Sequence, residues 1–504
     1  DTDGDGTPDC YEDCDYDPLK VEAGICGCGV TDTDNDGDGV ADCADTCSAP
    51  DIAELQAADI QAEEAAPDGG IAPREDRGDL TAVSQQNGDA DPALDARAAL
   101  GQILPVGGVF PPRLAPEYAP SRGVIIPLPS LSRAQGTTGG DTITVLPLVR
   151  TIVEDLHAEI WSGPPGPFDD DVRNYYWQHR NQVRLSPNNP SVRWVRDFGP
   201  LSGIDPNGNL VMNVFGSHFG AYFSFWSGIT NLYRIIAKDR PLGLEGGNVM
   251  VNDDRVCITS EQSIVYARHV FQMENGNTPG PARDEIVASI KGYLGCNELL
   301  LLPTLPYEST GHIDIFAKYL NNRTVVVHEL RQTAITAFEA AYRHELCPTD
   351  TDCDECFIAH EVAKYRARLN RLKQALDDEA DIISRYRPAS LGAAFGGFTV
   401  VRVPMLIPLL GGDAINRAKN VIYSYVNSLL VNGKMLMPSY RQTELYADHL
   451  GLGGDFVSGP YAKAVFTANN GLMNGYETAA TKAFSGAGLQ TILETNFSKV
   501  FVYY

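Results

Sequence analysis

The sequence lacks any apolar run of the roughly 18 residues that a membrane-spanning helix needs. Its longest apolar stretches, NELLLLPTLP and FTVVRVPMLIPLL, are short and interrupted by proline, which predicts buried strands. Positive charge is also scarce, because 39 Lys and Arg stand against 66 Asp and Glu. The sequence therefore offers no transmembrane segment, and it has no basic face of the kind that nucleic-acid binding requires.

The acidity belongs to one part of the chain. Residues 1–100 hold 27 Asp and Glu against 4 Lys and Arg, a balance of −23, whereas the other 404 residues hold 39 against 35, a balance of −4. A length of 504 residues with 43% hydrophobic residues predicts two or three domains and a sizeable core. The larger part of the chain is therefore expected to be a nearly neutral globular domain.

Two copies of one motif stand at the N-terminus, 33 residues apart: DTDGDGTPDC (1–10) and DNDGDGVADC (34–43). Carboxylates at alternate positions, with a glycine at the sixth that allows a sharp turn, are the pattern of a calcium loop. An acidic disordered tail would not repeat this spacing in register with its cysteines. The predicted Ca²⁺ ligands are Asp1, Asp3, Asp5 and Asp9 for one ion, and Asp34, Asp36, Asp38 and Asp42 for the other.

Residues 1–47 resemble the thrombospondin type 3 calcium repeats of secreted bacterial proteins. Six of the 11 cysteines lie in this stretch, which predicts a disulfide framework and an oxidising compartment, so a secreted or cell-surface protein. The expected role of this small irregular module is a spacer or a surface attachment. Because the chain starts inside the first motif, its N-terminus is expected to be trimmed. Residues 48–100, rich in Ala, Asp and Glu, are expected to form a solvated linker.

From residue 101 to 504 the texture changes to short apolar strands, helices and Gly/Pro turns, which predicts an α/β or α+β domain. A long helical insertion is expected at about 332–386. Strands are expected at 122–131, 254–268, 297–303, 322–330, 396–405 and 432–440, and further helices at 144–160, 284–295 and 413–430.

Three stretches carry polar residues at the ends of apolar strands: RWVRDFGP (193–200), GLEGGNVM (243–250) and ESTGHIDIFAKY (308–319). On an extended backbone, His312 and Asp314 would point to the same side. Each stretch alone has a plain structural explanation. His-x-Asp is more often a structural pair, Arg-Asp an ion pair and Glu-Gly-Gly a turn.

In this order, and followed by SYVN (424–427), the three stretches resemble the Porphyromonas-type peptidyl-arginine deiminase and agmatine deiminase family of the guanidine-modifying pentein superfamily. PEYAPSRGVIIPLP (116–129) is similar to the opening strand of that family, so the resemblance covers about 115–450. It implies a five-bladed α/β propeller with a central cleft, and hydrolysis of a guanidinium to a ureido group and ammonia without a catalytic cofactor.

The resemblance also implies roles for individual residues. Asp197 and Asp314 would grip the guanidinium, His312 would act as general acid and base, and Glu245 would orient His312. Arg196, Asn248 and Asn427 would support the cleft, and the two asparagines could contact the substrate. Agmatine and free arginine are usually processed in the cytoplasm, so the calcium repeats and disulfides favour peptidyl-arginine as the substrate.

The nucleophile of the family, a cysteine in a G-x-H-C pattern near the C-terminus, has no counterpart in this sequence. Cys257 and Cys296 are in the wrong places, and for Cys353 and Cys356 in CDECFIAH a disulfide is favoured over a zinc site. Two explanations stand. In the first, SGAGLQTIL (485–493) takes the place of the G-x-H-C turn with Thr491 for the cysteine, and the protein is a catalytically dead, arginine-binding surface protein. In the second, NFSKVFVYY (496–504) is the strand that precedes the cysteine, and the C-terminus is truncated. The strand pattern favours truncation.

Overall fold

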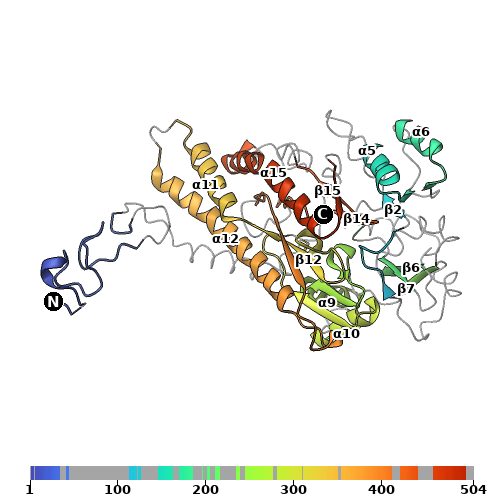
Figure 1. Ribbon diagram of the computed structural model, residues 1–504, viewed down its shortest axis with the longest axis horizontal. Coiled ribbons are helices and arrows are strands. Elements are labelled where there is room, and N and C mark those ends of the chain that lie inside the picture. The colour runs from blue at the N-terminus through green and yellow to red at the C-terminus, as the bar shows by residue number, and fades with distance from the viewer. Residues whose placement is uncertain are drawn as a thin grey trace.

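The computed structural model describes residues 2–4, 6–33, 41–44, 113–121, 123–126, 146–162, 170–185, 196, 201–204, 210–215, 234–238, 244–275, 281–308, 310–349, 353–410, 420–440 and 458–494. Strands and helices alternate along the large domain, so the predicted mixed α/β class is confirmed (Figure 1). None of the helices in these ranges combines the length and the apolar character that crossing a bilayer would require. The linker predicted at 48–100 lies outside the described residues.

The described strands form five sheets of three or four strands, and four of the sheets follow one pattern. In each of these, the first strand pairs antiparallel with the second, and the second pairs parallel with the third across a longer connection. The four triplets are β5 (Leu201–Ile204), β6 (Leu210–Phe215), β7 (Arg234–Lys238); β8 (Met250–Val251), β9 (Val256–Ser260), β10 (Glu298–Leu302); β11 (Ala317–Tyr319), β12 (Thr324–Glu329), β13 (Thr399–Pro404); and β14 (Leu429–Val431), β15 (Lys434–Pro438), β16 (Gln490–Glu494).

The fifth sheet is wholly parallel and comprises β2 (Gly123–Ile126), β3 (Glu159–Ser162) and β4 (Val183–Leu185). β1 (Arg113–Leu114) extends the β5 sheet at its edge. Parallel neighbours need a crossover, because a tight hairpin can join only antiparallel strands. In this sheet the crossovers contain α5 (Leu146–Arg150), continued by a π-helical turn at Thr151–Asp155, and α6 (Asp170–Gln178).

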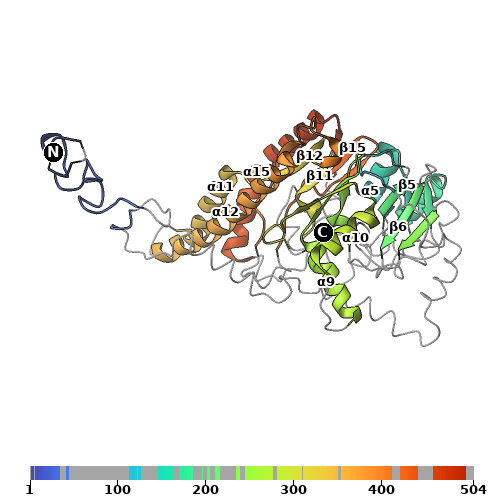
Figure 2. The same cartoon turned by 90° about the horizontal axis from the view of Figure 1, so that it is seen from below.

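The predicted helical insertion is confirmed as two helices, α11 (Gln332–Leu346) and α12 (Glu355–Arg385), which cross from β12 to β13. They run beside α15 (Pro460–Gly486), the crossover of the last sheet, in both views (Figures 1 and 2). Phe338 and Tyr342, one turn apart on α11, pack against Tyr365 of α12 and Tyr461 of α15. These aromatic contacts join the three helices into the largest apolar core of the described residues.

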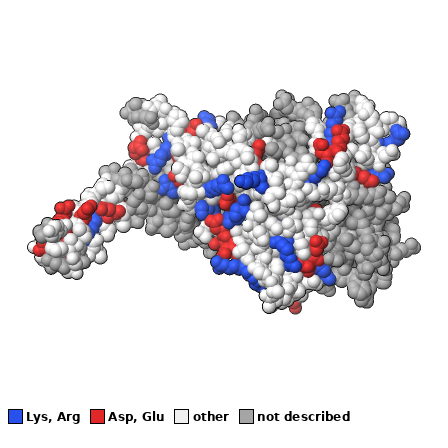
Figure 3. All heavy atoms as spheres, in the orientation of Figure 1, with Lys and Arg blue, Asp and Glu red and all other residues white. Residues whose placement is uncertain are grey.

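Disulfides are present in both parts of the chain. Cys14 pairs with Cys28 and Cys26 with Cys43 in the N-terminal module. In the large domain, Cys257 of β9 pairs with Cys296, which follows α10 (Arg283–Leu294), and Cys347 pairs with Cys353 across the turn between α11 and α12. The disulfide favoured over zinc at Cys353 therefore forms, although its partner is Cys347. Acidic and basic side chains interleave over the large domain on the face drawn in Figure 3.

Three predicted elements differ from the structure. The stretch 254–268 is a strand only at β9, after which α9 (Gln262–Asn275) begins. The helix expected at 144–160 ends at Asp155, and β3 follows from Glu159. In 413–430, the described part from Asn420 is not helical, because an antiparallel bridge between Leu409 and Val421 and tertiary hydrogen bonds of its polar groups replace the helical ones.

Candidate active site

His312 and Glu245 form a buried pair where two connections between sheets meet. His312 precedes the 3-10 turn Ile313–Ile315 on the way into β11, and Glu245 precedes the 3-10 turn Gly246–Asn248 on the way into β8. The imidazole Nε2 lies 2.6 Å from Glu245 Oε2, and both side chains are almost completely inaccessible to solvent. Because an ionised carboxylate only accepts hydrogen bonds, Nε2 carries the proton. Glu245 therefore fixes both the tautomer and the orientation of the ring.

The loop that carries His312 is held by Glu308, a residue that the sequence reasoning did not single out. The Glu308 carboxylate accepts hydrogen bonds from the backbone N–H groups of Thr310, Gly311 and His312, and from the Thr310 hydroxyl. Gly311 has φ +70°, and a Cβ there would clash with Gln262. A buried acid just before a turn in the sequence Thr-Gly-His was the available signal.

Asp314 lies in the 3-10 turn, so the expected extended His-x-Asp geometry is not what brings it to the site. The backbone is extended at His312 but turns at Ile313. The Asp314 side chain is buried, and neither carboxylate oxygen accepts a hydrogen bond from the described residues. Its nearest charged partner is the Arg196 Nε, 3.5 Å from Oδ2. Burial raises the pKa of Asp314, although Arg196, His312 and Lys318 oppose the shift.

Glu117 joins Arg196 and Lys318 beside Asp314. Its two oxygens accept from the terminal nitrogens of Arg196 at 3.2 Å each and from Lys318 Nζ at 2.7 Å each. Both cations also donate to the carbonyl oxygen of Ser428. Burial alone would raise the pKa of Glu117, but the two cations outweigh it and lower that pKa to about 2. Burial, reinforced by the charge of Arg196, lowers the pKa of Lys318 to about 8.

The two asparagines implied by the family resemblance differ in what they contact. Asn248 is fully engaged, since its amide nitrogen donates to the hydroxyls of Ser260 and Ser263 and its amide oxygen accepts from the Ser260 N–H. The side-chain amide of Asn427 is buried and makes no hydrogen bond to the described residues. The geometry therefore gives Asn248 a scaffolding position and leaves the Asn427 amide available for a ligand.

Asp197 lies outside the described residues, but its neighbour Arg196 shows where this segment runs. A Cβ on Gly246 would clash with the Arg196 carbonyl oxygen, so the Glu-Gly-Gly turn packs directly on the backbone of Arg196. Glycine is required at position 246 for that close approach. The first and second of the three polar stretches are thus neighbours in space.

Thr491, the alternative nucleophile position, is the second residue of β16 and pairs in register with Met435 of β15. Residues 485–493 therefore form the end of α15, a turn at Ala487 and Gly488, and most of β16, so Thr491 lies in the strand after the small-residue turn. By contrast, the site residues Glu245, His312 and Asn427 all lie on connections that enter the first strand of a sheet. NFSKVFVYY lies outside the described residues.

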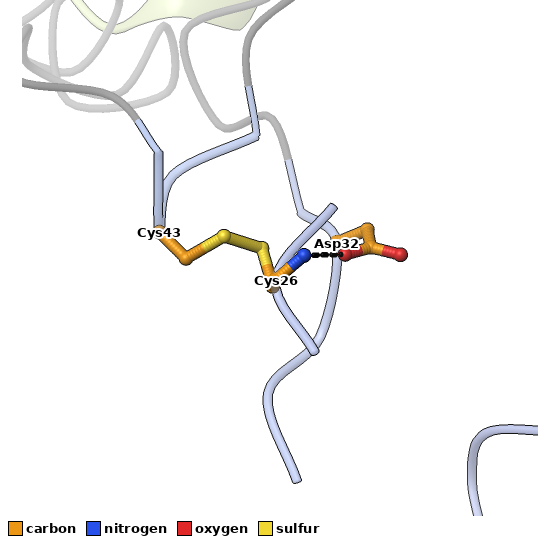
Figure 4. Close-up of side chains that lie close together, drawn as sticks. All are labelled: Cys26, Asp32 and Cys43. Carbon is orange, nitrogen blue, oxygen red and sulfur yellow. Dashed lines mark hydrogen bonds between the residues drawn. A yellow bond between two sulfur atoms is a disulfide. The ribbon is translucent and has the colours of Figure 1, made fainter. Parts of the chain in front are cut away.

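One cluster in the described residues brings together side chains of metal-ligand type: Cys26, Asp32 and Cys43 (Figure 4). The two sulfurs form a disulfide, so no thiolate is available to bind an ion. The Asp32 carboxylate accepts the Cys26 N–H at 2.7 Å and pairs with Lys20, and these contacts lower its pKa. This cluster therefore stabilises the fold of the N-terminal module through a disulfide, a hydrogen bond and an ion pair.

Among the predicted calcium ligands, Asp3, Asp9 and Asp42 are described, and Asp1, Asp5, Asp34, Asp36 and Asp38 lie outside the described residues. Gly6 has φ +100°, the sharp-turn conformation expected at the sixth position of such a loop. Asp9 accepts hydrogen bonds from the backbone N–H and the hydroxyl of Thr2, and Asp42 accepts one from the Thr33 hydroxyl. The last aspartate of each repeat thus binds a threonine, Thr2 within the first repeat and Thr33 just before the second.

Comparison with known proteins places this site in a family. Residues 113–450, more than half of the chain, match the model of the Porphyromonas-type peptidyl-arginine deiminases. Agmatine deiminase of Pseudomonas savastanoi is 24% identical over 275 residues, which are 51% of this chain and 65% of that protein. Agmatine deiminase of Stutzerimonas stutzeri gives 24% over 277 residues with the same coverage, so the match spans less than two thirds of either relative.

Among solved structures, agmatine deiminase of Enterococcus faecalis superposes with a TM-score of 0.46 at 14% identity, covering 79% of this chain and 95% of that one. The family model covers the Arg196, Glu245, His312 and Asn427 connections and the segment around Glu117. The chain belongs to the Porphyromonas-type peptidyl-arginine deiminase family.

Proposed function

We propose that this protein binds a guanidinium group and is a hydrolase of the deiminase type, which converts that group to a ureido group and ammonia. The observation that carries the proposal is the buried His312–Glu245 pair beside Asp314, a buried carboxylate with no hydrogen bond from the described residues. A guanidinium is planar and cationic at any physiological pH, and its N–H groups match carboxylate oxygens in pairs. Membership of the deiminase family supports the same reaction.

The roles follow from the chemistry of the groups. Asp314, together with Asp197, would hold the guanidinium and fix its central carbon for attack. After a thiolate adds to that carbon, the His312 imidazolium would give its proton to the departing ammonia, and the neutral ring would then take a proton from the attacking water. Because Nε2 is held by Glu245, these transfers fall to Nδ1. The thiolate returns when the ureido product leaves.

The cysteines of the large domain are unsuited to be that nucleophile, since Cys257 pairs with Cys296 and Cys347 with Cys353, and Cys356 lies in the first turn of α12, away from the connections that carry the site residues. The other site residues lie on connections between sheets, whereas Thr491 lies within β16, so we propose that Thr491 does not take the place of the nucleophile. We further propose that the five sheets are the five blades of a pentein propeller.

Guanidinium binding is tested by calorimetric titration with agmatine. The wild-type protein should bind it, and Asp314→Asn should weaken binding about tenfold or more, the cost of losing a charge-assisted hydrogen-bond pair. Glu339→Gln is the matched control, because it breaks a part-buried ion pair with Arg366 on α11 and α12, apart from the polar residues of the site. Equal affinities in all three proteins would refute the proposal. An assay of ammonia release from agmatine tests hydrolysis.

The substrate class and location are proposed together. Disulfides in the large domain support an oxidising compartment, which favours a secreted or cell-surface protein acting on peptidyl-arginine. Titration with N-acetyl-arginine amide beside agmatine and free arginine distinguishes the three. The peptide analogue should bind most tightly, and a preference for agmatine would contradict this assignment.

We also propose that the two N-terminal repeats bind Ca²⁺ and that the module serves as a spacer or surface attachment. The left-handed turn at Gly6 and the loop closure by Asp9 fit a calcium loop, and the repeated aspartates supply the oxygen donors that Ca²⁺ prefers. Titration with Ca²⁺ should show binding, and Asp36→Asn should remove one site. Unchanged binding in that variant would count against the second loop.

A further inference from the structure

The group proposed for the substrate already has a counterpart inside the protein. Arg196 carries a guanidinium whose Nε lies 3.5 Å from Asp314 Oδ2. A guanidinium can present two parallel N–H groups to a carboxylate, a stronger arrangement than a single contact. If Arg196 turned to Asp314 in that way, it would occupy the carboxylate on which a substrate guanidinium depends.

Glu117 holds the other edge of Arg196. Both terminal nitrogens of the guanidinium donate to Glu117, and one of them also donates to the Ser428 carbonyl oxygen. A two-pronged pair with Asp314 would need at least one of these terminal nitrogens, together either with Nε or with the other terminal nitrogen. With Glu117 in place, Arg196 Nε lies 3.5 Å from Asp314 Oδ2, and neither Asp314 oxygen accepts a hydrogen bond from the described residues.

Glu117 is itself fixed by three parts of the fold. It lies on the segment between β1 and β2. Its carboxylate accepts a hydrogen bond from Lys318 Nζ at the centre of β11, and its Oε1 accepts another from the backbone nitrogen of Leu430 in β14 at 3.3 Å. Lys318 is only 2% exposed and directs its ammonium to Glu117 and to the Ser428 carbonyl oxygen. The carboxylate is thus locked at the point where these sheets meet Arg196.

We propose that Glu117 is a positioning residue. By holding the two terminal nitrogens of Arg196, it prevents the protein's own guanidinium from taking the place of the substrate guanidinium on Asp314. This inference rests on the proposed function, because it concerns the same carboxylate. It assigns specificity for an external guanidinium to a residue that contacts neither the substrate nor His312.

A change in net charge could also weaken agmatine binding when Glu117 is replaced. Double variants separate this explanation from competition by Arg196. Glu117, Asp314, Arg196 and Lys318 together carry no net charge, so Glu117→Gln leaves an excess positive charge that would repel a cationic ligand. Removing either cation from that variant restores the balance. Only the removal of Arg196 also removes the internal competitor.

The experiment is calorimetric titration of agmatine against five proteins: wild type, E117Q, E117Q/R196M, E117Q/K318M and E117D. We expect E117Q to weaken binding about ten- to one-hundredfold, because a charge-assisted contact between Arg196 and Asp314 must break first. E117Q/R196M should recover most of that loss, whereas E117Q/K318M should not. Recovery in both double variants would overturn the proposal in favour of charge.

E117D keeps the proposal testable if the neutral variants fail to fold. It retains the negative charge, but its side chain is one methylene shorter and cannot hold both terminal nitrogens of Arg196. It should weaken binding, and wild-type affinity in E117D would overturn the proposal. Failure of the proposed function looks different, since wild type and D314N would then bind agmatine equally or not at all. Thermal melting of each variant confirms folding, and E339Q should match wild type in affinity.

Discussion

Glu308 supports the loop of His312, and its replacement gives the sharpest structural prediction. In Glu308→Ala, three backbone N–H groups at Thr310, Gly311 and His312 lose a carboxylate acceptor, and the Thr310 hydroxyl loses one as well. Glu308 and His312 are both buried, so water cannot simply replace the lost acceptor.

The magnitude follows from those contacts. A hydrogen bond to a charged group contributes about 1.5–3 kcal/mol, and neighbouring bonds to one carboxylate are not additive, so we expect a loss of about 3–6 kcal/mol. For a domain of about 400 residues, whose unfolding entropy is near 0.8 kcal/mol/K, this lowers the melting temperature by about 4–7 °C. Thr310→Val removes only the hydroxyl contact and should cost about 1 kcal/mol.

Differential scanning calorimetry measures the melting temperatures, and titration with agmatine reports on the site. Because His312 is held through its own backbone N–H, Glu308→Ala should weaken agmatine binding even well below its melting temperature. The reasoning is refuted if Glu308→Ala melts within a degree of Thr310→Val and binds agmatine as tightly as wild type.

Three further predictions concern the scaffold. Gly246→Ala places a Cβ against a backbone oxygen and should cost about 1–3 kcal/mol in chemical denaturation, while Gly292→Ala, on an open face of α10, should be neutral or slightly stabilising. Burial lowers the pKa of His328 from 6.5 to about 4, so the unfolded chain takes up a proton on this imidazole at a higher pH than the folded protein does. Up to about 3 kcal/mol of the free energy of unfolding should therefore be lost as the pH falls from 6.5 to 4. In urea titrations, His328→Gln should make the free energy of unfolding less dependent on pH in that range. Removing the disulfide with a Cys257→Ala/Cys296→Ala variant opens a loop of 39 residues and should lower the free energy of unfolding by up to about 4 kcal/mol; an unchanged urea midpoint would contradict this.

The sequence pointed to residues that the fold brings together, but it did not predict the geometry in which they meet. His312, Asp314 and Glu245 could be picked out because their residue types and order resemble a family, and the long helices α11 and α12 because a helical period persists over many residues. The strand-like stretch 254–268 was mistaken in its second half, since Ser-Ile-Val-Tyr fits a helix as well as a strand when read alone. Glu117 and Glu308 were missed because a carboxylate that binds distant cations or its own backbone has no local pattern.

The missed residues and the recognised ones share a physical cause. In their described parts, the connections that carry Glu245, His312 and Asn427 contain little regular secondary structure, so backbone ladders do not fix them there. Each is instead fixed by a polar side chain that binds backbone groups: Asn248 for the Glu-Gly-Gly turn, Glu308 for the His312 loop, and Ser424, which accepts the Asn427 N–H.

Such anchors hold the site residues independently of the sheets behind them. A change at an anchor should therefore impair guanidinium binding at temperatures where the strands and helices remain intact, whereas a change in the helical core of α11, α12 and α15 should lower stability and leave affinity unchanged. Ser424 is the strictest case, because its hydroxyl donates to the Ile315 carbonyl oxygen and so ties the Asn427 loop to the turn that contains Asp314. Ser424→Ala should displace both residues at once. If calorimetry shows full agmatine affinity in that variant, the two connections are positioned by their strands after all.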